Sequence, residues 1–155
     1  MEPVMTASER PARPDTADDD PTVRSVMSTR LVGIVPAATA HVALRLMAAR
    51  EVRHLPVIDS FEHPRVVSEA DLLRELLASH WPFAVAPPRV EDVARPAVVV
   101  GPADRLSTAA RAMHRSGDDV VLVEENGTLV GMLTAADVIS AAALATVRGG
   151  SGRSS

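Results

Sequence analysis

One pattern occurs twice in this chain at a constant separation of 66 residues. Arg65-Val66-Val67-Ser68-Glu69-Ala70-Asp71 returns as Gly131-Met132-Leu133-Thr134-Ala135-Ala136-Asp137. The same offset aligns Pro36 with Pro102, Met47 with Met113 and Val57 with Val123, without a gap over about 40 residues. Such a fixed offset indicates an internal duplication. Each half is too small to bury its own apolar faces, so we expect the halves to pack together about a pseudo-two-fold axis that leaves two clefts between them.

Each half alternates short apolar runs with segments of helical spacing, which predicts a β-α-β-β-α repeat and an α/β (α+β) fold class. In the first half we expect a helical turn at 22–27, strands at 31–35, 52–58 and 65–67, and helices at 39–50 and from Ser68. In the second half we expect a turn at 89–93, strands at 97–100, 120–123 and 129–133, and helices at 107–115 and from Thr134. Asn126-Gly127 predicts a tight hairpin turn. The last helix of each half is expected to bury four apolar residues: Leu72, Leu73, Leu76 and Leu77, and Val138, Ile139, Ala142 and Ala143.

Composition places the boundaries of these segments. Residues 1–21 hold six acids against two arginines and are expected to form a disordered acidic tail. The remaining segments are expected to be repeat 1 at 22–80, a connector at 81–88, repeat 2 at 89–147 and a flexible tail at 148–155. The connector holds the only tryptophan, Trp81, and Phe83. We expect these rings to hold the connector on the core; an aromatic platform for a ligand is the alternative.

Residue usage excludes several classes of function. The chain has no cysteine and no lysine, which excludes disulfides, thiolate metal sites, a P-loop and Schiff-base chemistry. The five histidines lack metal-ligand spacing and no nucleophile lies beside a base, so we expect neither an enzyme nor a metal site. Outside the acidic tail the charges balance, which argues against a nucleic-acid partner. No apolar run approaches the roughly 18 residues of a membrane span and no leader segment is evident, so we expect a cytoplasmic protein without membrane association.

The repeated corner, where a strand runs into a helix, is the candidate site. A helix start offers unpaired N–H groups that bind phosphate, the Thr134 hydroxyl can donate to a phosphate oxygen, and the Asp137 carboxylate can accept both hydroxyls of a ribose. The same Thr-x-x-Asp spacing is close to that of a capping box, which stabilises a helix start without any ligand. The residues alone leave both interpretations open.

The chain resembles a tandem pair of cystathionine β-synthase (CBS) domains over roughly residues 22–147. The resemblance lies in His54-Leu55-Pro56-Val57-Ile58-Asp59, in residues 67–73 (Val-Ser-Glu-Ala-Asp-Leu-Leu) and in residues 131–139 (Gly-Met-Leu-Thr-Ala-Ala-Asp-Val-Ile). It implies a compact regulatory module that binds AMP, ADP, ATP or S-adenosylmethionine, needs no cofactor and pairs into a disc-shaped homodimer. No fused effector remains in the sequence, so a stand-alone protein that signals to a separate effector protein is expected.

The resemblance also implies which residues line each cleft. The first cleft combines Thr134, Ala136 and Asp137 with four residues of repeat 1: Arg30, Val32, Arg53 and His54. The second combines Ser68, Ala70 and Asp71 with three residues of repeat 2: Val98, Asp119 and Val120. There the acids Asp118 and Asp119 stand where a phosphate partner is expected, and Arg65 replaces Gly131, so that it either crowds a ligand or supplies a cation. We therefore predict a functional first site and a weaker second site.

The resulting hypothesis is a regulatory module that senses an adenosine nucleotide or S-adenosylmethionine. The alternative is a CBS-type module for dimerisation or protein interaction without any small ligand, in which Thr134 and Asp137 act only as helix caps.

Overall fold

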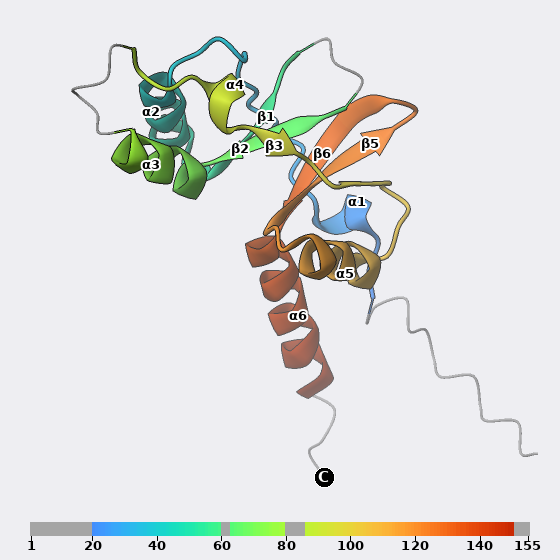
Figure 1. Ribbon diagram of the computed structural model, residues 1–155. Helices are drawn as coiled ribbons and strands as arrows, with labels where there is room; N and C mark the ends of the chain where they lie inside the picture. The colour runs from blue at the N-terminus through green and yellow to red at the C-terminus, as the bar shows by residue number, and fades with distance from the viewer. Residues whose placement is uncertain (1–19, 60–62, 80–85, 151–155) are drawn as a thin grey trace, which may run out of the picture.

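The computed structural model describes residues 20–59, 63–79 and 86–150 (Figure 1). Residues 1–19 of the expected acidic tail, turn residues 60–62, the connector residues Trp81 and Phe83, and residues 151–155 lie outside these ranges. Within them the chain has a mixed α+β fold with two three-stranded sheets.

The first sheet has the order β1-β2-β3, with β1 (His54–Val57), β2 (Arg65–Ser68) and β3 (Arg95–Pro96) all antiparallel. Helices α2 (Ala40–Arg50) and α3 (Glu69–Ala78) lie beside it, with the short α4 (Val90–Val93) against them (Figure 1). Their core is aliphatic, as the near-absence of aromatic residues requires, and Met47, Leu55 and Leu72 are almost fully buried in it.

The second sheet has the order β4-β5-β6, with β4 (Val99–Val100) parallel to β5 (Val120–Glu125) and β6 (Thr128–Thr134) antiparallel to it. This sheet contacts three helices: α1 (Val23–Val26), α5 (Leu106–Ser116) and α6 (Ala135–Gly150). The predicted tight turn joins β5 to β6: Asn126 and Gly127 both have positive φ, 53° and 75°. A third cluster of Val66, Val120, Leu122 and Met132 joins the two halves.

The two halves exchange their first helices. Although α1 is the first helix of repeat 1, Val23 is fully buried in the core of the second half, and its N–H donates to the Asp104 carbonyl at 2.8 Å. In return Val90 of α4 is fully buried in the core of the first half, and its N–H donates to the Ala38 carbonyl at 2.8 Å. Neither half therefore contains a complete core of its own.

Equivalent residues of the two exchanged segments are 67 residues apart, whereas equivalent residues in the rest of the two repeats are 66 apart. Val23 and Val90 begin equivalent helices. Two further pairings match in the same way: Ser28 bridges Met132 on β6, and Arg95 pairs with Val66 on β2. Ser28 and Arg95 are thus equivalent positions of the two repeats, which the 66-residue alignment does not show.

The structure corrects three expectations about elements. The strand predicted at 31–35 is reduced to a single parallel bridge between Ile34 and Val57. The last helices bury less than their apolar spacing predicts, because these residues are exposed: Leu73, Leu77, Ile139, Ala142 and Ala143. Helix α6 continues to Gly150, so residues 148–150 are helical and do not belong to the expected flexible tail.

Asp20, in the tail predicted to be disordered, caps a helix 87 residues away in sequence. Its carboxylate accepts from the Ser107 N–H at 2.9 Å and from the Ser107 hydroxyl at 2.6 Å, at the start of α5, whose own N-cap residue Arg105 provides no side-chain cap. The hydrogen bond from the Ser107 hydroxyl, followed by that from its N–H, lowers the pKa of Asp20.

We expect Asp20→Ala to lower the free energy of unfolding by about 1 kcal/mol at neutral pH, the usual effect of losing a helix cap. Because the folded-state pKa lies below the unfolded-state value, this stabilisation is complete above about pH 4 and is lost as the pH falls through the folded-state pKa. Urea unfolding of both proteins from pH 7 to pH 3 measures the effect. If the difference in the free energy of unfolding between the wild type and Asp20→Ala stays constant down to pH 3, the Asp20 carboxylate is not the cap of α5.

Candidate functional site

The start of α6 has a complete capping box. The Asp137 N–H donates to the Thr134 hydroxyl at 3.3 Å, and the Thr134 N–H donates to Asp137 Oδ2 at 2.9 Å. The Ala135 N–H donates to the Asp119 carbonyl at 2.8 Å. Within the described residues, Asp137 Oδ1 and the Ala136 N–H have no protein hydrogen bond and the Thr134 hydroxyl donates none, so one acceptor and two donors remain for a ligand.

These groups lie in a cleft of about 370 Å³ between the halves, called here the Asp137 cleft. It is lined by Ser28, Arg30, Glu51, Val52, Arg53, His54, Asp119, Met132, Thr134, Ala135, Ala136 and Asp137. Six of the seven residues predicted for the first site are therefore brought together. The seventh, Val32, packs against the core of the first half instead.

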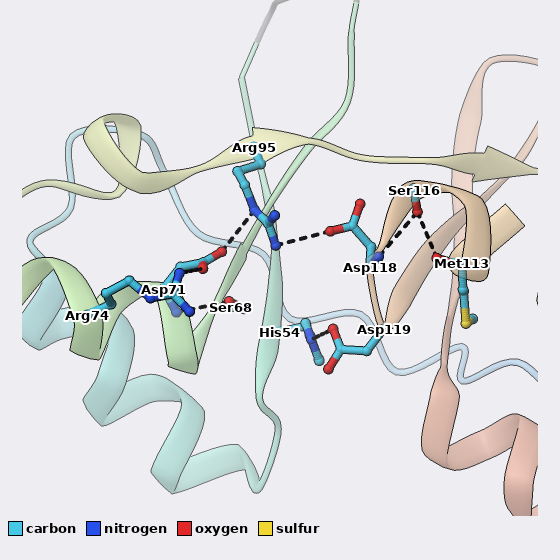
Figure 2. A network of polar contacts seen from close by, with 9 residues as sticks. All are labelled: His54, Ser68, Asp71, Arg74, Arg95, Met113, Ser116, Asp118 and Asp119. Carbon is cyan, nitrogen blue, oxygen red and sulfur yellow. Dashed lines mark hydrogen bonds and ion pairs between the residues drawn. The ribbon is translucent and has the colours of Figure 1, made fainter.

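His54 is the buried polar side chain of this cleft, 8% exposed on β1. Its Nε2 lies 2.8 Å from Asp119 Oδ1, across the boundary between the halves (Figure 2). Asp119 was predicted to belong to the second site, and this prediction is wrong. The hydrogen bond from Ala135 N–H to the Asp119 carbonyl holds Asp119 beside the start of α6, so its carboxylate faces the Asp137 cleft.

The second predicted site, called here the Asp71 corner, consists of Ser68, Ala70 and Asp71 at the start of α3. The Asp71 N–H donates to the Ser68 hydroxyl at 3.1 Å, as in the first site. The Asp71 carboxylate, by contrast, is taken by two arginines: Oδ1 pairs with Arg74 at 2.8 Å and Oδ2 with Arg95 at 2.9 Å.

The remaining residues predicted for the second site are structural. Val98 packs against the core of the second half, and Val120 is 4% exposed in the cluster between the halves. Arg65, expected either to crowd a ligand or to supply a cation, forms a two-point ion pair with Asp59, at 2.6 Å and 3.2 Å. A Cβ at its counterpart Gly131 would require the flexible Met27 side chain to move and would lie 3.2 Å from the Ser28 carbonyl oxygen.

The residues of the two corners that the sequence reasoning missed include Ser28, Glu51 and Arg95. Ser28 and Arg95 precede the point where the repeat offset changes from 67 to 66, so the fixed alignment paired them with the wrong partners. Glu51 had a usable signal, because its counterpart at the 66-residue offset is Gly117 and both residues end a helix.

Glu51 adopts a left-handed conformation (φ 55°, ψ 41°) that disfavours residues with a side chain, as Gly117 does at the end of α5 (φ 71°, ψ 17°). We expect Glu51→Gly to raise the free energy of unfolding by about 1 kcal/mol and the melting temperature by roughly 3 °C. Gly117→Glu is the matched reverse change, because a Cβ at Gly117 meets no atom within 4 Å and only the backbone conformation opposes it. Thermal unfolding of both variants measures the effect; a destabilised Glu51→Gly protein would contradict it.

A family model described as "CBS domain" matches residues 23–78 and 90–144. The chain therefore belongs to the CBS-domain family and contains a tandem pair of these domains. A curated relative, the uncharacterized protein MJ1225 of Methanocaldococcus jannaschii, is 28% identical over 119 residues, which are 76% of this chain and 41% of the relative. The chain thus spans about two fifths of the length of that relative.

Two solved structures illustrate the shared fold. CBSX2 in complex with AMP is 29% identical, has a TM-score of 0.63, and the match covers 81% of this chain and 98% of that chain. A hexameric CBS-CP12 protein from bloom-forming cyanobacteria is 24% identical, has a TM-score of 0.70, and the match covers 78% of this chain and 71% of that chain.

Two other features bear on the site. Among the described residues, no group of three or more histidine, aspartate or glutamate side chains is placed to hold a metal ion. In the same part of the chain, every helix is too short or too polar to cross a membrane.

Proposed function

We propose that this chain is a regulatory module that binds one adenosine ligand in the Asp137 cleft and signals its presence to a separate protein. The observation that carries the proposal is the asymmetry between the two corners. Asp137 keeps one carboxylate oxygen open in a cleft of about 370 Å³, whereas both oxygens of Asp71 are paired with arginines. This volume falls within the usual range for small-molecule sites.

The chemistry of the cleft fits the parts of a nucleoside phosphate. The open oxygen of Asp137 accepts from the ribose hydroxyls, and the Ala136 N–H and the Thr134 hydroxyl donate to a phosphate at the positive end of α6. Arg30 and Arg53 supply charge for that phosphate. The complex of CBSX2 with AMP supports the choice of an adenosine ligand.

The charge of the cleft favours ligands of low negative charge. Two arginines face three carboxylates, those of Glu51, Asp119 and Asp137. Each further phosphate adds negative charge beside these carboxylates, so AMP or S-adenosylmethionine is favoured over ATP.

A thermal-shift panel with AMP, ADP, ATP and S-adenosylmethionine tests the proposal. A ligand that binds the folded state adds stability in proportion to the logarithm of its concentration, and the melting temperature rises with it. At 100 times the dissociation constant, the free energy of unfolding increases by about 2.7 kcal/mol. A melting temperature unchanged by all four compounds at millimolar concentration would overturn the proposal.

A second candidate function is a module for self-association or protein interaction, with or without a ligand. Exposed apolar side chains gather on the last helix of each repeat: Leu73 and Leu77 on α3, and Ile139, Leu144 and Val147 on α6. A helix that exposes such residues normally packs against a partner. We propose that these helices pair two chains into a homodimer. Sedimentation equilibrium measures the mass of the wild type, expected to be that of a dimer, and of Leu77→Glu, expected to be that of a monomer. Equal masses for the two proteins would contradict the proposed dimer.

A further inference from the structure

Arg95 ties the two halves together at the Asp71 corner. It enters from β3, and its Nε lies 2.9 Å from Asp71 Oδ2 in the first half (Figure 2). Its Nη2 lies 3.0 Å from Asp118 Oδ1 in the second half. Both carboxylate side chains are largely buried, with exposed fractions of 13% for Asp71 and 16% for Asp118. A single guanidinium thus neutralises the acids of both halves where the second cleft is expected.

The equivalent position of the other repeat is Ser28. Ser28 bridges Met132 on β6 as Arg95 pairs with Val66 on β2, and Ser28 lines the Asp137 cleft. A short side chain therefore stands at the open corner and a long cationic one at the closed corner. The two corners also have the same start of a helix, with a hydroxyl that accepts from the aspartate N–H.

We propose that Arg95 occupies the second ligand position in place of a ligand, and that the side chain at this position determines which corner binds. The guanidinium takes one of the two oxygens of Asp71, the equivalent of the ribose-binding Asp137, and it also pairs with Asp118 of the second half. This inference rests on the proposed adenosine function, because it extends that function to the number and the position of the sites.

Exchange of the two side chains tests the inference in the full chain. Adenosine is the probe, because it carries the ribose diol and no phosphate that Asp118 and Asp119 would repel. We expect isothermal titration to show one adenosine per wild-type chain, two per Arg95→Ser chain and none per Ser28→Arg chain. In the Asp137→Ala background, Arg95→Ser should raise the affinity for adenosine at least tenfold, and Asp71→Ala should remove this gain.

Arg74→Ser is the matched control. It removes the other arginine bound to Asp71, but that arginine is 74% exposed and does not reach the second half. It should create no second site. The Arg95→Ser protein should also melt slightly lower than Arg74→Ser, because Asp71 keeps Arg74 whereas the largely buried Asp118 loses its arginine partner.

The outcomes separate the inference from the proposed function. One adenosine per chain in both the wild type and the folded Arg95→Ser variant overturns the inference and leaves the proposed function in place. Binding by Arg95→Ser alone supports the inference and overturns the assignment of the Asp137 cleft. Binding by neither protein overturns both.

Discussion

Asp137→Ala is expected to lower the affinity for AMP by about 100-fold. The substitution removes a charged acceptor for two ribose hydroxyls, and hydrogen bonds to charged groups contribute about 1.5–3 kcal/mol each. It also removes the capping bond from the Thr134 N–H, so a stability loss of about 1 kcal/mol accompanies the loss of binding. Isothermal titration and thermal unfolding of the same samples measure the two effects separately.

Two variants serve as controls for this result. In Asp137→Asn the amide oxygen can still accept from the Thr134 N–H, so the helix cap survives while the carboxylate charge is lost; binding should weaken with little change in stability. Asp71→Ala changes the equivalent residue of the other repeat, whose oxygens are already taken by Arg74 and Arg95. If Asp71→Ala abolished AMP binding while Asp137→Ala left it unchanged, the two corners would have been assigned the wrong way round.

The largest loss of stability is expected from Val23→Asp. Val23 is fully buried in the core of the second half, where an added carboxylate would have neither water nor a partner cation. An uncompensated buried charge costs about 4 kcal/mol, which corresponds to a fall in melting temperature of roughly 10–15 °C. Thermal unfolding followed by circular dichroism measures it.

Val42→Asp is the matched control, because the same substitution falls on an exposed valine in the first turn of α2. Surface changes of this kind usually alter stability by less than about 0.5 kcal/mol. Equal melting temperatures for the two variants would mean that α1 is not part of the core of the second half.

The duplication and the family resemblance let the sequence predict the fold and half of the residues that line the Asp137 cleft. A constant offset of 66 residues places Thr134 and Asp137 at a helix start, and the CBS resemblance adds Arg30, Arg53 and His54 from the other half. The structure brings these residues together. The two roles coexist at Asp137, because the capping box is formed and one carboxylate oxygen is still open.

The errors have two physical causes. The first is the change of offset before Ile34, which concealed that Ser28 and Arg95 are equivalent. The second is that side chains at a strand end can turn toward either of the two corners. Asp118 and Asp119 are neighbours in sequence, yet Asp118 pairs with Arg95 and Asp119 with His54 (Figure 2). Periodicity along the chain carries no information on that choice.

The exchange of α1 and α4 also limits the conformational changes by which ligand binding can be transmitted to another protein. Each half holds a helix of the other in its core, so the halves cannot separate as rigid bodies on a hinge without extracting that helix. A bound ligand therefore has to act by small shifts within one cooperative unit, and we expect a single thermal transition with and without ligand. The first described residue, Asp20, is fastened to α5 of the second half. Any such shift of α5 would consequently move Asp20 with it.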